Sequence, residues 1–243
     1  MQETCIIIPC YDEADRLDQQ AFLDFAKENP PVCFCFVNDG SRDKTLTILL
    51  ELQSKNPQQF LVSDLEVNRG KAEAVRQGIL KMTADKKFRF IGYFDADLAT
   101  PLSEINNLLG YFNGNDQLEI VFGSRKKTSD NNIRRNIFRH NFGKSYAWLT
   151  TSILGLPIYD TQCGAKIIRA STAAIVFKDP FLDQWLFDLE IFCRIKKEKG
   201  DAFKQSIKEV VVDTWTEKGD SKISFKDVAV LPYKTLKLFF KYR

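Results

Sequence analysis

The chain has 243 residues, of which 44% are hydrophobic and 28% are charged, and its net charge is +3. This length and composition predict a globular protein with a substantial core, built as one large α/β domain or two small ones. The small net charge argues against a general nucleic-acid binder. The chain starts directly with a predicted strand, so no signal peptide is expected. No uncharged apolar run reaches the ~20 residues that a transmembrane helix needs.

The cysteines predict neither disulfides nor a zinc site. All six are scattered without Cys-x-x-Cys spacing, and Cys5, Cys33 and Cys35 lie in apolar runs. We expect buried free thiols, as in a reducing cytosol. His140 is the single histidine, which leaves too few ligands for zinc.

Strands and helices are predicted to alternate through the first half of the chain. Continuous apolar runs predict strands, and apolar residues at helical spacing, such as Leu17, Phe22 and Phe25, predict helices. The expected strands are 4–9, 32–37, 60–65, 89–94 and 118–122, and the expected helices are 15–28, 43–54, 71–81 and 101–112. This alternation indicates an α/β protein with a mostly parallel sheet flanked by helices. Gly-x-Gly-x-x-Gly and the phosphate-loop lysine motif are absent, which disfavours dehydrogenase and P-loop interpretations.

Two later segments are predicted to be amphipathic, basic helices. Residues 131–154 combine a broad apolar face with Arg135 and Arg139 one turn apart, and residues 228–242 mix leucines and phenylalanines with lysines. The more common interpretation of such a segment is a core helix with one solvated side. The functional alternative is an interfacial helix that lies among lipid headgroups.

The most informative stretch is 93–101. A hydrophobic run ending in Phe94 is followed at once by Asp95 and Asp97, so a buried strand is predicted to present two carboxylates at its carboxyl end, where ligands bind in open α/β sheets. Two acids this close repel each other unless a cation lies between them, and their oxygens suit Mg²⁺ or Mn²⁺ together with substrate phosphates. The structural alternative is that Asp97 and Thr100 start the helix after Pro101 and that Asp95 is a solvated strand end.

Five loops follow the predicted strands, at 9–13, 38–43, 68–71, 95–100 and 123–125. Because parallel strands end at one edge of a sheet, we expect these loops to converge on one crevice. Asp39 can accept a hydrogen bond from a base or ribose, and Lys71 and Arg125 can neutralise phosphate. Gly40 and Gly70 allow close approach of the backbone. Each feature alone is more often a structural turn, but together they predict a site for a nucleotide diphosphate.

Several motifs resemble a known family. The runs 7–13, 37–45, 68–72 and 95–97 are similar to the signatures of family 2 inverting glycosyltransferases with the GT-A fold. The runs 160–166, 185–190, 209–212 and 215–222 are similar to the branch that acts on dolichyl or polyprenyl phosphate, and closest to its glucosyl members. The resemblance implies one nucleotide-diphospho-sugar transferase domain over 1–222, with a nucleotide-binding half at about 1–125 and an acceptor half at about 126–222. Residues 223–243 are then a basic amphipathic extension.

The resemblance also implies roles for residues at matching positions. Asp97 would be the principal ligand of Mg²⁺ or Mn²⁺, with Asp95 near the metal or the sugar. Arg125 would bind phosphate groups, together with one of Arg134, Arg135 or Arg139. The nucleotide sugar would be held by Pro9, Tyr11, Glu13, Val37, Asp39, Lys71, Asp95, Ala96 and Asp97. The acceptor side would contain Arg125, Asp160, Gln162 and Lys166, with Asp188 and Glu190 below it.

Three positions depart from the family pattern. Asn38 stands where many members have a second aspartate, Leu98 where glucosyl members often have glycine, and Ala165 where an aromatic residue is usual. These departures leave the donor open between UDP-glucose and GDP-mannose, with glucose favoured. The membrane anchors of some relatives are not expected here, so we expect a cytoplasmic protein that binds the membrane surface peripherally.

The implied reaction is direct displacement at the anomeric carbon of the nucleotide sugar, with Asp97, Arg125 and Asp160 as the catalytic residues. A polyprenyl phosphate is already an anion at neutral pH, because the second pKa of a phosphate monoester is about 6. Asp160 is therefore expected to position groups rather than act as a base, whereas a sugar hydroxyl acceptor would need one. The alternatives are a family 2 transferase with a glycan or other non-lipid acceptor, a nucleotidyltransferase, and a catalytically inactive sugar-nucleotide-binding or membrane-scaffold protein.

Overall fold

The structure is a computed structural model that describes residues 3–84, 86–128, 132–134, 150–151, 153–216, 218 and 225–242. Its elements in the first half are β1 (Thr4–Cys10), α1 (Gln19–Glu28), β2 (Val32–Asp39), α2 (Thr45–Lys55), β3 (Phe60–Leu65), α3 (Lys71–Ala84), β4 (Phe90–Phe94), α4 (Glu104–Gly110) and β5 (Ile120–Ser124). Those that follow are β6 (Asn132–Arg134), β7 (Ala165–Arg169), α6 (Ala170–Val176), α7 (Phe187–Lys199), a 3-10 turn η1 (Gly200–Ala202), α8 (Phe203–Ser206), β8 (Ile207–Val211), β9 (Thr214–Thr216) and α9 (Phe225–Tyr242).

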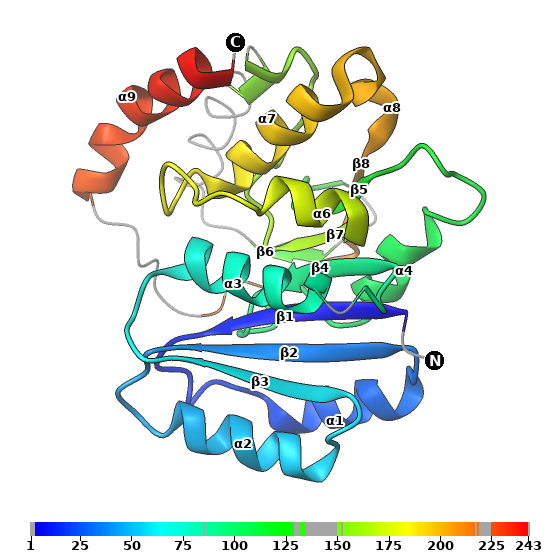
Figure 1. Cartoon of the computed structure of the whole chain (residues 1–243), viewed down its shortest axis with the longest axis vertical. Coiled ribbons are helices and arrows are strands. Elements are labelled where there is room, and N and C mark those ends of the chain that lie inside the picture. Colours follow the sequence, from blue (N-terminus) through cyan, green and yellow to red (C-terminus); the bar gives the residue numbers. More distant parts are fainter. Residues whose placement is uncertain are drawn as a thin grey trace.

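A mostly parallel sheet of seven strands runs through the molecule in the order β3-β2-β1-β4-β7-β5-β8 (Figure 1). Strand β7 is antiparallel to both of its neighbours, β4 and β5, and the other pairings in this sheet are parallel. Strands β7 and β8 come from the predicted acceptor half, so the two predicted halves share one sheet. The predicted α/β fold with a mostly parallel sheet is therefore confirmed.

Helices cover both faces of this sheet, because successive side chains of a strand point to opposite faces and are apolar on both. Cys33, Cys35 and Val37 of β2 face a core shared with α3, α6 and α7. Phe34 and Phe36 face the other core, which includes residues of α1, α2 and α4. Because both faces are buried, the strands read as continuous apolar runs rather than as alternating ones.

Two helices begin later than the sequence pattern predicts, where an aspartate side chain bonds to a nearby backbone amide. The carboxylate of Asp18 accepts a hydrogen bond from Ala21 N at 3.0 Å, so α1 begins at Gln19 rather than at Asp15. Asp43 accepts from the amide of Thr45 at 2.9 Å, so α2 begins at Thr45 rather than at Asp43. Side chains that bond to nearby amides favour helix ends over helix interiors.

The predicted helix at 131–154 is wrong at its start. Residues Asn132–Arg134 form strand β6, which pairs in parallel with β9. Ile133 is buried there against Ala99, Val212 and Trp215, and this tertiary packing overrides the helical pattern. Most of the remaining segment, including Arg135 and Arg139, lies outside the described residues.

The C-terminal extension forms α9, which lies beside α7 (Figure 1). Leu238 is 1% exposed on its inner face. In the part of the chain that the structure describes, no helix is long and apolar enough to cross a membrane. All six cysteines are free and buried, as predicted, and burial raises the pKa of the Cys163 thiol to about 11.

Candidate functional site

The carboxyl ends of β1 to β5 and of β8 meet at one edge of the sheet, since these strands run in the same direction. Strand β7 runs the opposite way, so it presents its first residue at this edge, and Ala165 pairs there with Phe94. The run 160–166 is thereby brought beside Asp95. The structure thus assembles the strand-end loops that the sequence predicts to converge, and it adds the loop before β7.

Asp95 is the point where the two sets of motifs meet. Its carboxylate lies 2.5 Å from Nζ of Lys71 at the start of α3. Gly164 packs so closely against it that a Cβ at position 164 would come within 2.0 Å of the Asp95 Oδ2 atom. Burial opposes the charge on Lys71, but Asp95 and then Asp188 outweigh it and raise the pKa of the ammonium. Only a residue without a side chain at 164 leaves Asp95 in this position.

Asp97 lies two residues further on, in a tight turn. Its Oδ1 accepts a hydrogen bond from Ala99 N at 2.9 Å. Burial, and then the negative charge of Asp95, raises the pKa of this carboxyl group above its ordinary value. Leu98 has a φ of 53°, in the left-handed region that favours glycine. The turn therefore has a backbone conformation at position 98 that glycine would adopt more easily than leucine does.

The pair Asp95 and Asp97 fits a divalent metal in its chemistry. A raised pKa at Asp97 indicates that negative charge there lacks full compensation, and a cation would supply it. Among the described residues, no group of three or more His, Cys, Asp or Glu side chains could hold a metal. Two carboxylate ligands completed by substrate phosphates is a common arrangement for Mg²⁺.

Asp39 holds the glycine turn before α3. Its two carboxylate oxygens accept hydrogen bonds from the amides of Arg69 and Gly70, both at 2.8 Å. Gly40 has a φ of 62°, and a Cβ there would come within 2.4 Å of Asn68 N. Asp39 as a whole is 3% exposed. Its two hydrogen bonds join the loop at 38–43 to the loop at 68–71.

The first loop, at 9–13, is tied to the second. The amide of Glu13 donates to Oγ1 of Thr45 at 2.8 Å, and Oδ1 of Asp12 accepts from Arg42 N at 2.8 Å. The structure places Pro9, Tyr11 and Glu13 at this edge of the sheet, as β1 ends. Val37 is different: its side chain is fully buried and packs toward Gly78 of α3, so it faces the core.

Arg125 and Asp160 form a bidentate ion pair at the end of β5. The Nε and Nη2 atoms of Arg125 donate to Oδ2 and Oδ1 of Asp160 at 2.6 and 2.8 Å, and Arg125 N donates to Oδ2 at 3.0 Å. Burial opposes the charge on Arg125, but Asp160 outweighs it and raises the pKa of the guanidinium. Glu209 of β8 accepts from the amides of Tyr159 and Asp160 at 3.0 and 2.8 Å, which fixes the chain at this point.

Lys166 and Asp188 form a buried pair beneath Asp95. Nζ of Lys166 lies 2.5 Å from Oδ1 of Asp188 and donates to the carbonyl of Cys163 at 2.6 Å. The hydroxyl of Tyr93 also donates to Asp188. Lys166 is 0% and Asp188 4% exposed. Closed off from the surface, both side chains are placed to support the Cys163–Gly164 loop rather than to touch an acceptor directly.

Several contributors to this edge were not among the predicted site residues. Gly164 contacts Asp95, and Glu209 contacts Asp160. Neither contact can be recognised from the neighbouring sequence. Trp215 of β9 lies under the Arg125 guanidinium at 5.5 Å, and Lys218 is near enough to Asp97 to lower its pKa. Gln162, which was among the predicted acceptor residues, contributes its backbone amide, which donates to Oδ1 of Asp160 at 3.3 Å. The only available signal was membership of the runs 160–166, 209–212 and 215–222.

A cavity of about 470 Å³ opens on the Asp160 side of the site. It is lined by Ser124, Lys126, Thr151, Pro157, Ile158, Tyr159, Glu209 and Val211. Its volume lies in the range of small-molecule sites. The cavity lies next to Asp160, because Glu209 in its lining accepts from the amide of Asp160.

Comparison with known proteins gives two kinds of likeness. The family model described as "Glycosyl transferase family 2" matches residues 5–181. The dolichyl-phosphate beta-glucosyltransferase of Dictyostelium discoideum is 30% identical over 233 residues, which cover 90% of this chain and 68% of the relative. The human protein with the same description is 28% identical, over 91% of this chain and 70% of the relative.

Solved structures share the fold at much lower identity. The glucosyl-3-phosphoglycerate synthase of Mycobacterium tuberculosis, crystallised with Mn²⁺ and UDP-glucose, superposes with a TM-score of 0.69 at 11% identity. The match covers 99% of this chain and 79% of that one. The same enzyme bound to UDP gives a TM-score of 0.68 at 13% identity. These likenesses establish a shared architecture.

Proposed function

The chain belongs to glycosyl transferase family 2, and from that premise we propose that it transfers glucose from a nucleotide sugar to a polyprenyl phosphate such as dolichyl phosphate. The observation that carries the proposal is the position of Asp95. This carboxylate contacts Lys71 of the donor motifs and Gly164 of the run 160–166, which supports one reaction centre shared by the two sets of motifs. The names of the relatives from Dictyostelium and human support glucose and dolichyl phosphate as the substrates.

The donor side would hold the nucleotide sugar along the loops at 9–13, 38–43, 68–71 and 95–100. Asp97, with Asp95 beside it, would bind Mg²⁺ or Mn²⁺, which would neutralise the charge that develops on the departing diphosphate. The Mn²⁺ and UDP-glucose in the structurally similar mycobacterial enzyme support this choice of ligands. Lys71 supplies a further positive charge at the same point.

The acceptor side would orient an anionic phosphate toward the anomeric carbon. In the displacement, a phosphate oxygen forms the new bond to that carbon while the bond from the carbon to the diphosphate oxygen breaks. The acceptor carries no proton that must be removed, because its second pKa is about 6. Arg125 would attract the phosphate, and Asp160, whose carboxylate already accepts three hydrogen bonds from Arg125, would hold the guanidinium in place.

The lipid acceptor requires contact with a membrane, and α9 offers a surface for it. Val230, Tyr233, Leu236 and Phe240 are 43%, 69%, 52% and 66% exposed, and their spacing puts them on one side of the helix. The inner side carries Leu238 and Thr235, which are buried. No acidic residue follows Asp227, whereas Lys237 and Lys241 are exposed on α9. An exposed apolar and basic helix face suits an anionic lipid surface, so we infer peripheral binding there.

A transfer assay tests the reaction. Purified protein is mixed with a short polyprenyl phosphate and either UDP-glucose or GDP-mannose, with Mn²⁺ or with EDTA. We expect a glucosylated, organic-soluble lipid phosphate from UDP-glucose, formed only with the metal. Transfer to a glycan but not to the lipid phosphate would identify a family 2 enzyme with another acceptor and would overturn the proposal.

Vesicle sedimentation tests the membrane surface. Replacing Tyr233 and Phe240 together by serine should lower binding to anionic vesicles at low salt by at least about tenfold, because both side chains would bury apolar area in the lipid. The matched control is Leu50→Ser, which removes a side chain that is 49% exposed on the distant helix α2. Equal binding by the double variant and the parent would contradict this role for α9.

A further inference from the structure

The loop between α6 and α7, residues 177–186, lies against the glycine turn at 68–71. The side-chain amide of Gln184 lies against Gly70, where a Cβ would come within 2.5 Å of its Oε1 atom. Just after the loop, the ring of Phe187 lies 5.9 Å from Nζ of Lys71, the residue that pairs with Asp95. Movement of this α6–α7 loop would therefore displace the glycine turn that Asp39 orders.

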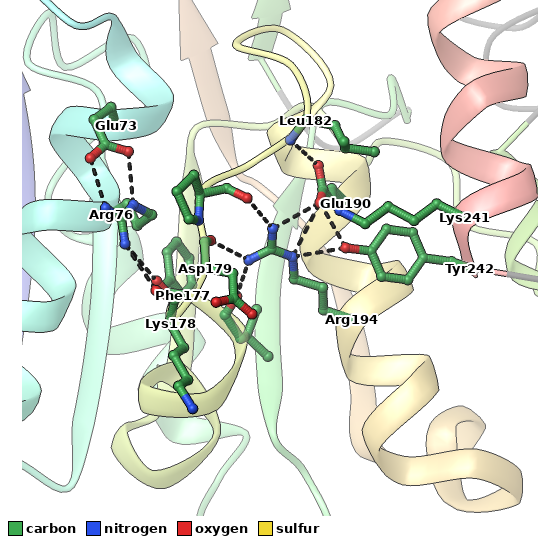
Figure 2. A network of polar contacts seen from close by, with 12 residues as sticks. Glu73, Arg76, Phe177, Lys178, Asp179, Leu182, Glu190, Arg194, Lys241 and Tyr242 are labelled. Atoms are coloured by element: carbon green, nitrogen blue, oxygen red, sulfur yellow. Dashed lines mark hydrogen bonds and ion pairs between the residues drawn. The ribbon is translucent and has the colours of Figure 1, made fainter.

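Arg194 of α7 holds the α6–α7 loop from beneath (Figure 2). Its Nη1 atom donates to the carbonyls of Val176 and Asp179, and its Nη2 atom donates to that of Pro180, all at 2.7 Å. The guanidinium also stacks over the ring of Phe181 at 4.3 Å. One rigid, planar cation thus fixes an irregular stretch of backbone that has no strand or helix partner of its own.

Glu190 joins this arrangement to the C-terminal helix. Its fully buried carboxylate accepts from Nη2 of Arg194 at 2.8 Å, from Leu182 N in the loop at 2.8 Å, and from the hydroxyl of Tyr242 in α9 at 2.7 Å. Nζ of Lys241 in α9 lies 3.6 Å from Oε1 of Glu190, the oxygen that also accepts from Tyr242 (Figure 2). A buried charge is stable only when its partners are all in place, so the loop and α9 depend on each other.

A second tie joins α9 to the tip of the α6–α7 loop. Nζ of Lys234 lies 2.5 Å from Oδ2 of Asp183. The other oxygen of Asp183 accepts from the amides of Trp185 and Leu186 at 2.9 and 3.2 Å, just before α7 begins. Gln184 stands between these anchored residues. Helix α9 therefore holds the loop at two neighbouring points just before Gln184, directly at Asp183 and through Glu190 at Leu182.

We propose that α9 positions the nucleotide-sugar donor through the α6–α7 loop, with Lys234 and Tyr242 as positioning residues. The proposal rests on the function proposed above, because that function names the ligand. Neither side chain touches the donor; each holds the loop that supports Gly70 and Lys71.

The test is donor affinity in single-residue variants, measured by calorimetry with UDP-glucose or GDP-mannose and Mn²⁺ in the absence of vesicles. Lys234→Glu replaces the ion pair with Asp183 by a repulsion, and Tyr242→Phe removes only the hydroxyl, which donates to Glu190 and accepts from Nε of Arg194. We expect Kd and KM for the donor to rise about threefold to tenfold, with kcat changed less than about twofold. Lys234→Arg keeps the positive charge and should bind donor with the Kd of the parent.

Matched controls separate this role from a general loss of charge or of a hydroxyl. Lys197→Glu reverses an exposed charge on α7 away from the loop, and Tyr111→Phe removes a hydroxyl from a residue that is 40% exposed. Both should bind donor like the parent. Circular dichroism at the assay temperature checks that all variants are folded.

The outcomes are distinguishable. If the parent binds no nucleotide sugar, the proposed function fails and this inference fails with it. If the parent binds donor and Lys234→Glu and Tyr242→Phe bind it equally well, the inference alone is overturned. Weaker binding that tracks a loss of folded protein would show that the contacts are only structural, and it would overturn the inference as well.

Discussion

The two sides of the candidate site are held together in different ways. On the donor side, hydrogen bonds from backbone amides to polar side chains fix the loops, as when Asp39 accepts from the amides of Arg69 and Gly70. On the acceptor side, the fixing contacts are buried ion pairs between distant parts of the chain. Arg125 pairs with Asp160, and Lys166 pairs with Asp188.

This difference predicts how a substitution on each side affects activity and stability. A change at Asp97 removes a carboxylate that would face substrate, and the fold stays intact because no buried ion pair of this carboxylate is broken. A change on the acceptor side leaves a buried charge without its partner, which costs stability as well as activity. Experiments that compare activity with stability at single positions therefore test whether the contrast is real.

The largest expected effect is that of Asp97→Ala. The variant should lose about 10²- to 10³-fold in kcat, because it removes the principal charge for the metal and diphosphate. Its thermal midpoint should stay within about 2 °C of the parent, since the removed carboxylate has a raised pKa and gives little net stabilisation. Steady-state transfer assays and calorimetric melting measure both. Asp116→Ala, at a side chain 94% exposed, is the control, and a loss of comparable size there would contradict the assignment.

Gly164→Ala comes next and tests the contact between the two sides. The added Cβ would come within 2.0 Å of Asp95, so Asp95 must move. A displacement of about 1 Å in a catalytic group can cost ~100-fold in rate, and we expect a loss of about 10- to 100-fold. Gly110→Ala is the matched control, because nothing lies within 4 Å of a Cβ at that position. Full activity of Gly164→Ala would show that the position of Asp95 does not affect the reaction rate.

Asp160→Asn should have the smallest effect on the rate. The amide oxygen can still accept from Arg125, and an anionic acceptor needs no base, so we expect about a tenfold loss of kcat, equivalent to roughly 1.4 kcal/mol. Because the variant leaves Arg125 buried beside a neutral group, its thermal midpoint should fall more than that of Asp97→Ala. Loss of activity as complete as in Asp97→Ala would instead indicate obligatory base catalysis by Asp160.

The same contrast explains how much the sequence could predict. The strands that form the sheet up to β5 were recognisable because each is a continuous apolar run, and the convergence of their loops follows from parallel topology. The predicted starts of α1 and α2 were too early, because Asp18 and Asp43 bond to nearby amides instead of joining the helix. Ile133 was assigned to a helix because the packing that makes it part of β6 comes from Trp215, far along the chain.

On the acceptor side, the residue types were predicted but their partners were not. Lys166 was predicted to line the acceptor side, yet it is fully buried and paired with Asp188. A single sequence gives no signal for which charges meet in the core. Glu209 escaped notice for the same reason, since its two hydrogen bonds reach amides about fifty positions earlier in the chain.

The reversed strand β7 has a consequence for how the protein is made. Strand β4 pairs with β1 on one side and with β7 on the other. During synthesis, its second edge stays open until residues 165–169 have left the ribosome. An open, apolar strand edge invites aggregation. A fragment that ends before residue 165 should therefore precipitate rather than survive as a small nucleotide-binding module, so the nascent chain gains solubility only when its reversed strand closes the gap.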